Sequence, residues 1–260
     1  MPRVLATEIL KLRRTLALWV SLLCPLVVVL LAFAVSMRFD QPFSEPRSAW
    51  NLVSANAYSI WALLMLPLFV ALVTTLTGHL EWAGSQWKHL FALPIPRWRL
   101  YAAKLVANLL LCGLATLALI GWTLLAGLLL WAFKRPLGVE LGPPPPTLFV
   151  LPFATLLAAL LLVALHSWIS MRFAAVVTGL GVGVAGSVGT LLVTGSRYID
   201  EYPWSFPIYV TSVVKALLTG EPSAFAGGTD QLWVRLAIFT VVAVAIALLG
   251  AWSVCRREIR

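Results

Sequence analysis

Six long runs without Asp, Glu, Lys or Arg limit what this chain can fold into more than any other feature of its sequence. They cover residues 15–36, 57–77, 105–133, 148–171, 173–196 and 236–255. An apolar helix of about 20 residues crosses the hydrocarbon core of a bilayer. We therefore expect an all-α, polytopic membrane protein, with six transmembrane helices in a single domain over residues 1–260.

Composition and motifs exclude a soluble enzyme and a built-in ATPase. The chain is 61% hydrophobic and 11% charged, whereas a soluble domain is about half apolar and about a quarter charged. No segment outside the runs could form an ATPase domain, and no lysine closes a G-x-x-x-x-G-K-[ST] loop. Nucleotide chemistry must therefore come from another chain.

The runs predict some details of the helices. The third run is longer than the membrane requires and must tilt, kink or protrude. Only Arg172 separates the fourth run from the fifth, which predicts a tight hairpin at one membrane face. Pro25, Pro67 and Pro152 lie inside runs and predict kinks, because neighbouring membrane helices can shield the freed carbonyl groups.

The basic residues predict the orientation. With the amino terminus inside, the inner segments hold twelve cations against three acids, a net charge of +9, whereas the outer segments hold seven of each. Lys and Arg are retained on the cytoplasmic side. We therefore expect a multi-pass protein of the cytoplasmic (inner) membrane with both termini in the cytoplasm. The predicted topology and the attraction to anionic lipid of the inner leaflet explain the basic net charge, so a nucleic-acid partner is not needed to explain it.

The first run could instead be a signal peptide, because Ala32-Phe33-Ala34 resembles a cleavage site. The run is longer than a typical signal-peptide core, and cleavage would leave five spans with the basic loops facing outward. Topology therefore argues against cleavage.

The residues before the first run predict an amphipathic helix on the inner membrane surface. Leu5, Ile9, Leu12 and Leu16 repeat at helical spacing, and the opposite side carries Thr7, Lys11 and Arg14. Such a helix can be a simple membrane anchor or a docking site for a protein, and both interpretations stay open.

The inner loop 78–104 is too long and too patterned for a simple turn. Its expected helix lies along the inner membrane face and ends at Pro94 and Pro96. One face carries Leu80, Gly84, Trp87 and Phe91, and another carries Glu81, Ser85 and Lys88. After the helix we expect an aromatic and basic belt that sets the depth of the third span, formed by Arg97, Trp98, Arg99, Tyr101 and Lys104.

Metal and disulfide sites are not indicated. His79, Glu81 and His89 lack the H-E-x-x-H spacing and a fourth ligand, so solvated histidines are favoured. Cys24 and Cys112 lie inside apolar runs and Cys255 lies at the end of one, which indicates no disulfide framework.

The outer segments 39–56 and 134–146 are expected to be connectors, the second stiffened by Pro143 to Pro146. The third outer segment, 197–231, has a helical apolar pattern from Pro207 to Leu218. This stretch is too short for a seventh span and carries Lys215, so we expect a helix in the outer interface.

The expected membrane interior lacks the charged groups that ion-coupled carriers need, which disfavours secondary active transport. His166 and Arg235 fall near run ends and are interpreted as interfacial. The fifth run contains Gly179 and Gly183 in a GxxxG arrangement, with Gly186 nearby. This pattern permits close helix packing, either within the chain or in a dimer.

An intramembrane hydrolase is the enzymatic alternative, because Ser187 lies in a glycine-rich segment. A nucleophilic serine needs a base within hydrogen-bond reach. His166 is expected near the inner end of the preceding span, far from Ser187. We therefore expect no catalytic residue.

Taken together, these features resemble the permease subunits of type 2 ATP-binding-cassette exporters, in the group that includes bacitracin and lantibiotic immunity permeases. The matching features are the basic amphipathic start 8–14, six spans with both ends inside, and a partly apolar outer segment before the last span. The inner loop matches through Glu81, Trp87, Lys88, Leu93, Pro94, Arg97, Tyr101 and Lys104.

The resemblance implies specific roles. The 78–93 helix would be the coupling helix in a cleft of a separate ATPase, which binds ATP and Mg²⁺ while this chain holds no cofactor. The residues expected to contact the ATPase or to lie at the end of this helix are Glu81, Trp82, Trp87, Lys88, Leu93 and Pro94. The interface helix would use Glu8, Lys11, Arg13 and Arg14. Two permeases, identical or sister subunits, would enclose a path along spans one, two and five.

The main functional hypothesis is therefore an export permease for an amphipathic peptide, a drug or a lipid-linked molecule. The alternatives are a non-transport membrane subunit for assembly or sensing, and the intramembrane hydrolase.

Overall fold

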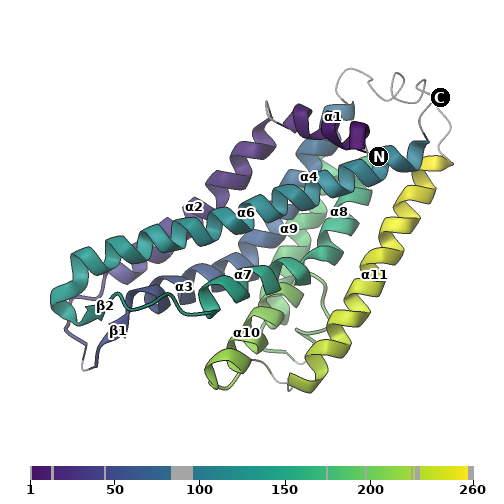
Figure 1. Ribbon diagram of the computed structural model, residues 1–260. Helices are drawn as coiled ribbons and strands as arrows, with labels where there is room; N and C mark the ends of the chain where they lie inside the picture. Colours follow the sequence, from purple (N-terminus) through teal and green to yellow (C-terminus); the bar gives the residue numbers. More distant parts are fainter. Residues whose placement is uncertain are drawn as a thin grey trace.

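The computed structural model is a helical bundle that, among the residues it describes, also contains one pair of two-residue strands (Figure 1). It describes residues 2–12, 15–43, 45–82, 96–173, 175–196, 198–223, 225 and 229–256. The α-helices are α1 (Pro2–Leu12), α2 (Leu16–Met37), α3 (Ala49–Ile60), α4 (Leu66–Trp82), α6 (Arg97–Lys134), α7 (Thr147–Ala158), α8 (Leu160–Arg172), α9 (Val176–Val193), α10 (Phe206–Thr219) and α11 (Thr229–Cys255). A π-helical turn η1 (Trp61–Met65) joins α3 to α4, and a 3₁₀ turn η3 (Arg135–Leu137) follows α6.

Among the described residues, five helices are long and apolar enough to cross a membrane, and the bent pair α7–α8 makes up to six. Each predicted run overlaps one of these segments, and the fifth run, 173–196, is longer than its helix, Val176–Val193. The second span is longer than predicted, because the helix starts at Ala49. The prediction of a connector over 39–56 is therefore wrong for its last eight residues. Trp50, Val53 and Ala57 are buried at helical spacing, and their packing outweighs the polar residues between them.

The breaks in the spans lie near the predicted prolines. Pro67 has no N–H to donate to the carbonyl four residues earlier, and the π turn η1 lies directly before it. Helices α7 and α8 meet at Ala159 with a bend of 43°, seven residues after Pro152. Helix α2 continues through Pro25.

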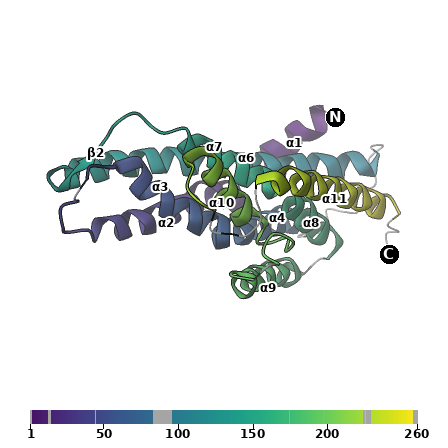
Figure 2. The same cartoon turned by 90° about the horizontal axis from the view of Figure 1, so that it is seen from below.

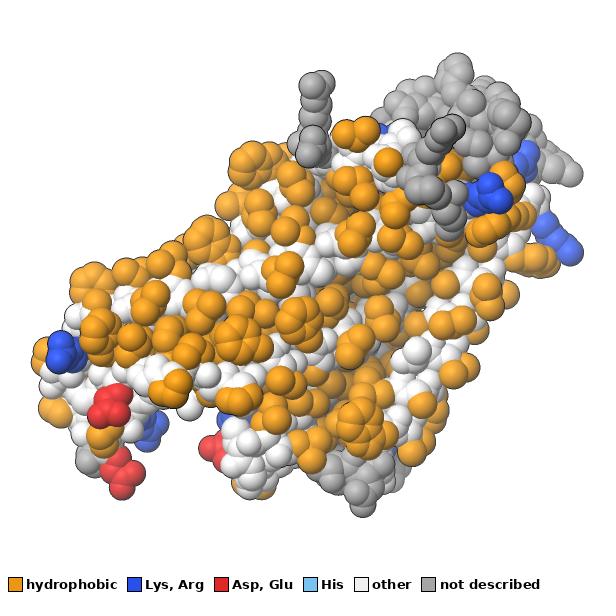
Figure 3. Space-filling view, viewed as in Figure 1, with side chains coloured by type: hydrophobic (Ala, Val, Ile, Leu, Met, Phe, Trp, Pro, Cys, Tyr) orange, Lys and Arg blue, Asp and Glu red, His pale blue; other side chains and the backbone are white. Residues whose placement is uncertain are grey.

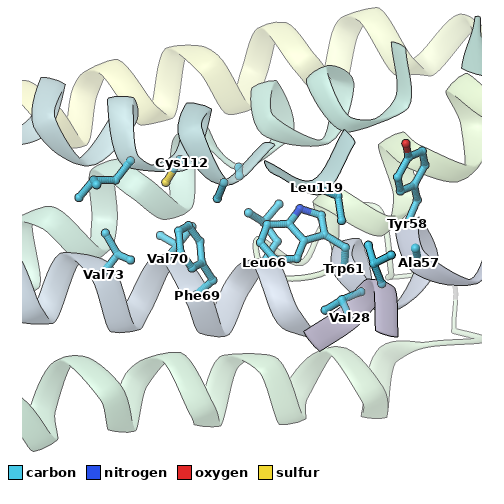
Figure 4. Close-up of a cluster of buried hydrophobic side chains, with 14 of the residues drawn as sticks. Val28, Ala57, Tyr58, Trp61, Leu66, Phe69, Val70, Val73, Cys112 and Leu119 are labelled. Atoms are coloured by element: carbon cyan, nitrogen blue, oxygen red, sulfur yellow. The ribbon is translucent and has the colours of Figure 1, made fainter. Parts of the chain in front are cut away.

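The main core lies where α2, α3, α4, α6 and α8 meet. Figure 4 shows Trp61, Leu66, Phe69 and Val70 along one helix, with Leu119 of α6 facing them. The rings of Trp61 and Phe69 pack with centroids 5.7 Å apart. Because all these side chains are almost fully buried, α3, η1 and α4 form the centre of the bundle.

The outer surfaces of α2, α9 and α11 carry large apolar side chains, and Figure 3 shows apolar side chains over α2 and α11. Val241 of α11 is 68% exposed and Leu192 of α9 is 80% exposed. A soluble protein rarely exposes contiguous apolar surface on this scale. These surfaces fit a lipid environment.

The bundle has two distinct ends (Figure 1). Helix α1, the end of α4, the start of α6 and the ends of α8 and α11 share one end, where Tyr101, Met171 and Val254 pack together. The other end carries α10 and the short parallel pair of β1 (Arg47–Ser48) with β2 (Val139–Glu140). We call these the inner and outer ends, following the predicted orientation.

Candidate functional site

The inner end contains the segment that the sequence predicts to be a coupling helix. Helix α4 continues without a break to Trp82, so residues 78–82 extend the span instead of starting a separate helix along the membrane. Gly78 lies against Ser170 of α8, where a Cβ atom would come within 2.9 Å. This close packing keeps the end of α4 against α8, in line with the rest of the helix. Any helix along the membrane face must begin after Trp82.

The predicted coupling residues are only partly described. Glu81 and Trp82 belong to the last turn of α4, but their side chains lie outside the described part of the structure. Trp87, Lys88, Leu93 and Pro94 also lie outside the described residues, as do Arg13 and Arg14 of the predicted interface helix.

The predicted amphipathic helix corresponds to α1, which packs against the bundle through one side and leaves other apolar side chains exposed. Glu8 and Leu12 are buried, whereas Ile9 and Leu16 are exposed. Lys11 donates to the Glu8 carboxylate over 2.8 Å, and the Lys104 ammonium lies 3.5 Å from its second oxygen. Lys104 compensates the buried Glu8 carboxylate, because a buried charge requires a partner. The position of α1 on the membrane surface stays a prediction.

Lys104 is buried in the structure and only 4% exposed. Its ammonium donates to the backbone carbonyl of Thr77 over 2.8 Å and faces Glu8. The predicted belt is therefore wrong for Lys104 and also for the buried Tyr101, whereas Trp98 and Arg99 are exposed. Lys104 connects α6 to both α1 and α4.

Further hydrogen bonds extend from Thr77 across the bundle. The Thr77 hydroxyl lies 2.8 Å from the Asn108 amide oxygen, and the Asn108 amide nitrogen donates to the Ser167 hydroxyl over 2.9 Å. All three side chains are buried. Glu8, Lys104, Thr77, Asn108 and Ser167 form what we call the inner polar network, which joins α1, α6, α4 and α8.

Sequence analysis missed this network. Lys104 and Asn108 are four residues apart and share a helix face, which is a signal available in the sequence. Nothing in the sequence pairs that face with Thr77 or Ser167, because both lie on other helices.

The glycine face of α9 packs inside the chain. A Cβ atom at Gly179 would clash with the Thr75 hydroxyl, one at Gly183 with Ala71, and one at Gly186 with Trp204. Small residues let two helix backbones approach closely. The three glycines thus bring α9 against α4 and against the turn that precedes α10, and α9 forms one edge of the bundle (Figure 2).

His166 lies beside this contact, in the middle of α8. The sequence-based interpretation as an interfacial group is wrong, because the side chain is 1% exposed and packs edge-on against Trp204 with centroids 6.0 Å apart. Within the described residues, neither ring nitrogen has a hydrogen-bond partner. The Ser187 hydroxyl donates to the Gly183 carbonyl over 2.8 Å. Ser187 and His166 therefore do not form a nucleophile and base.

Arg235 lies at the outer end of α11 and forms an ion pair with Asp200. Its guanidinium also lies 5.6 Å from the centre of the Tyr209 ring. These contacts fix the start of α11 to the turn before α10 and to α10 itself.

Over the part of the chain that the structure describes, no three His, Cys, Asp or Glu residues come close enough to hold a metal ion. Cys24, Cys112 and Cys255 are free thiols. His79 is exposed on α4.

Comparison with known protein families gives a match over most of the chain. The model of the ABC-2 family transporter proteins matches residues 4–190, from α1 through nearly all of α9. No curated protein and no solved structure matches the chain.

Proposed function

Because the chain belongs to the ABC-2 family of transporter proteins, we propose that it is the permease subunit of an ATP-binding-cassette exporter. The family match is the observation that carries this proposal, and it spans most of the helical bundle. Membership in this family implies a membrane transport component that works with a separate ATP-binding subunit.

The finer proposals concern substrate, partners and orientation. The permease exports an amphipathic or hydrophobic substrate such as a peptide antibiotic, a drug or a lipid-linked molecule, which could give antibiotic resistance by efflux. The partner ATPase binds ATP and Mg²⁺, and a second permease copy or a sister subunit completes the path. The charge excess of the inner segments supports an inner-membrane location with cytoplasmic termini.

The inner polar network supports a route for coupling. Residues 66–82 form one continuous helix of 17 residues, about 25 Å long. A displacement of its cytoplasmic end would therefore also move the residues that it contributes to the bundle core. Lys104 holds that end through the Thr77 carbonyl and connects it to α1 through Glu8. We propose that the partner ATPase contacts Glu81, Trp82, Trp87, Lys88, Leu93 and Pro94. Nucleotide binding then favours one of two arrangements of this end.

Purification of the tagged protein from its native membrane, followed by mass spectrometry, tests the proposal. We expect a co-purifying chain that carries a P-loop, and ATP hydrolysis that vanadate inhibits. If no ATPase co-purifies in several mild detergents, the permease proposal fails and a non-transport role in assembly or sensing becomes the better explanation.

A charge reversal tests the coupling contact. Glu81→Arg should lower the ATPase recovered with the permease while leaving the permease inserted and monodisperse. Glu201→Arg is the matched control, because Glu201 is an exposed carboxylate near the opposite end. Unchanged recovery with Glu81→Arg would remove Glu81 from the contact.

A further inference from the structure

A small cavity lies at the outer end between α3, α7 and α10, away from the inner polar network. It encloses about 140 Å³. Pockets for drug-sized ligands enclose about 300–1,000 Å³, whereas a cavity of about 150 Å³ holds a six-carbon ring. The cavity can therefore take one small end of a larger molecule. We call it the outer polar cavity, and its polar lining includes Asn51, Ser54, Tyr58, Thr147, Thr211 and Lys215.

Hydroxyl groups line the inside of the outer polar cavity. The Thr211 hydroxyl lies 2.7 Å from that of Thr155, and Tyr58 donates to the Leu148 carbonyl over 2.7 Å. Ser54 lines the same space, and no hydrogen bond involves its side chain within the described part of the chain. A polar group at this position in a membrane bundle needs a polar partner. Ser54 is therefore available to a polar guest, whereas the Thr211 hydroxyl is already engaged, since it also donates to the Pro207 carbonyl over 2.7 Å.

Two opposite charges lie at the mouth of the cavity. The Lys215 ammonium donates to the Glu221 carboxylate over 2.8 Å. Gly220 ends α10 with φ of 73°, a left-handed conformation, and so turns the chain back to bring Glu221 beside Lys215. The side chains are 46% and 63% exposed, and exposed pairs of this kind contribute little stability. A ligand that offers both charges can therefore exchange with the pair.

Apolar side chains lie next to this mouth. Leu218 is three residues after Lys215 on the same face of α10, and Leu151 of α7 lines the cavity itself. Leu218 is 44% exposed. In Figure 3 the molecule is hollowed beside α10, with side chains of both charges near the hollow. A polar cavity with an apolar rim suits an amphiphile whose head enters and whose tail stays outside.

We propose that the outer polar cavity binds the zwitterionic headgroup of a phospholipid. The phosphate accepts hydrogen bonds from Lys215 and from the hydroxyl of Ser54, and the ammonium pairs with Glu221. The equal numbers of opposite charges favour a zwitterion over an anionic headgroup, whose charge would face Glu221 without compensation. The site is independent of the proposed export function, since it requires neither the partner ATPase nor transport.

Native mass spectrometry of the purified chain in detergent tests this site. The probes are phosphatidylethanolamine and phosphatidylglycerol with identical acyl chains. We expect the first bound molecule of phosphatidylethanolamine to bind about tenfold more tightly than the first molecule of phosphatidylglycerol. This is the affinity ratio that one charge-assisted hydrogen bond gives. The double variant Lys215→Met/Glu221→Gln should remove this preference, and Ser54→Val should weaken the binding of both lipids, because both carry the phosphate.

The matched control is Lys134→Met/Asp40→Asn, which removes another outer ion pair, with 3.1 Å between the charged atoms, outside the cavity. It should keep the preference. Equal binding of the two lipids by the unaltered chain, or a preference that the Lys215/Glu221 variant retains, would overturn the proposal. Phosphoethanolamine carries the same headgroup but lacks acyl chains. If it competed for the site as well as phosphatidylethanolamine does, the assignment to a lipid would be overturned.

Discussion

The two ends of the bundle each hold a lysine and a glutamate close together, but in opposite environments. At the inner end, Lys104 is 4% exposed and also bonds to the Thr77 carbonyl. At the outer end, Lys215 and Glu221 lie largely in the open at the mouth of a cavity. The inner pair is part of a network that joins four helices, whereas the outer pair connects α10 only to the residue after its own C-cap.

This difference shows that burial decides what a charge pair can do. A buried ion cannot readily exchange its partners for water, so the inner pair keeps α1, α4 and α6 connected to one another. The exposed outer pair can exchange its partner for a ligand at little cost. The inner end therefore suits the transmission of force, and the outer end suits reversible binding.

Substitution of Lys104 and of Lys215, one at a time, tests this contrast. The loss of Lys104 should give the largest effect on stability. Lys104→Met leaves Glu8 buried without that partner and the Thr77 carbonyl without its donor. Loss of one member of a buried pair costs about 3–5 kcal/mol. Lys215→Met should cost less than about 1 kcal/mol. Thermal unfolding of both variants in the same detergent measures the difference, and equal melting temperatures would contradict the contrast.

A second test asks whether tight packing continues from the inner end along α4. Gly183→Ala places a Cβ atom onto Ala71 of α4 and should cost about 1–3 kcal/mol by overpacking. Gly181, on the same helix, has open space around it. Gly181→Ala should therefore be neutral or gain up to about 1 kcal/mol from helix propensity. If both variants melt alike, α9 does not pack closely on α4.

The sequence was sufficient to find the spans, because about 20 apolar residues without charge leave few alternatives. The helix at 206–219 also followed from its apolar spacing. The start of α3 did not, because polar residues there hid the buried positions Trp50 and Val53. Their burial depends on α6 and α7, which the local pattern does not contain.

The sites show the same division between local and distant information. Lys104 was expected in a belt at the membrane surface and not as a buried residue, because its partners Glu8 and Thr77 come from other helices. The outer polar cavity combines three segments that are far apart in the sequence. Periodicity identifies which residues share a face and leaves open which faces meet.

The smallest expected effect is the titration of the outer pair. The hydrogen bond and the charge of Lys215 lower the pKa of Glu221 below its ordinary value of 4.5. A carboxylate with a lowered folded-state pKa contributes stability above its ordinary pKa, and this contribution is lost as the pH falls through the folded-state pKa. The pair should therefore persist at pH 4.5 and break only in more acidic solution. Carboxylate ¹³C NMR of labelled protein follows this titration, with Glu221→Gln to assign the resonance. In Lys215→Met the pKa of Glu221 should return towards 4.5. An unchanged titration of Glu221 in this variant would mean that the two side chains do not pair. It would then contradict the exchange of this ion pair for a ligand at the mouth of the cavity.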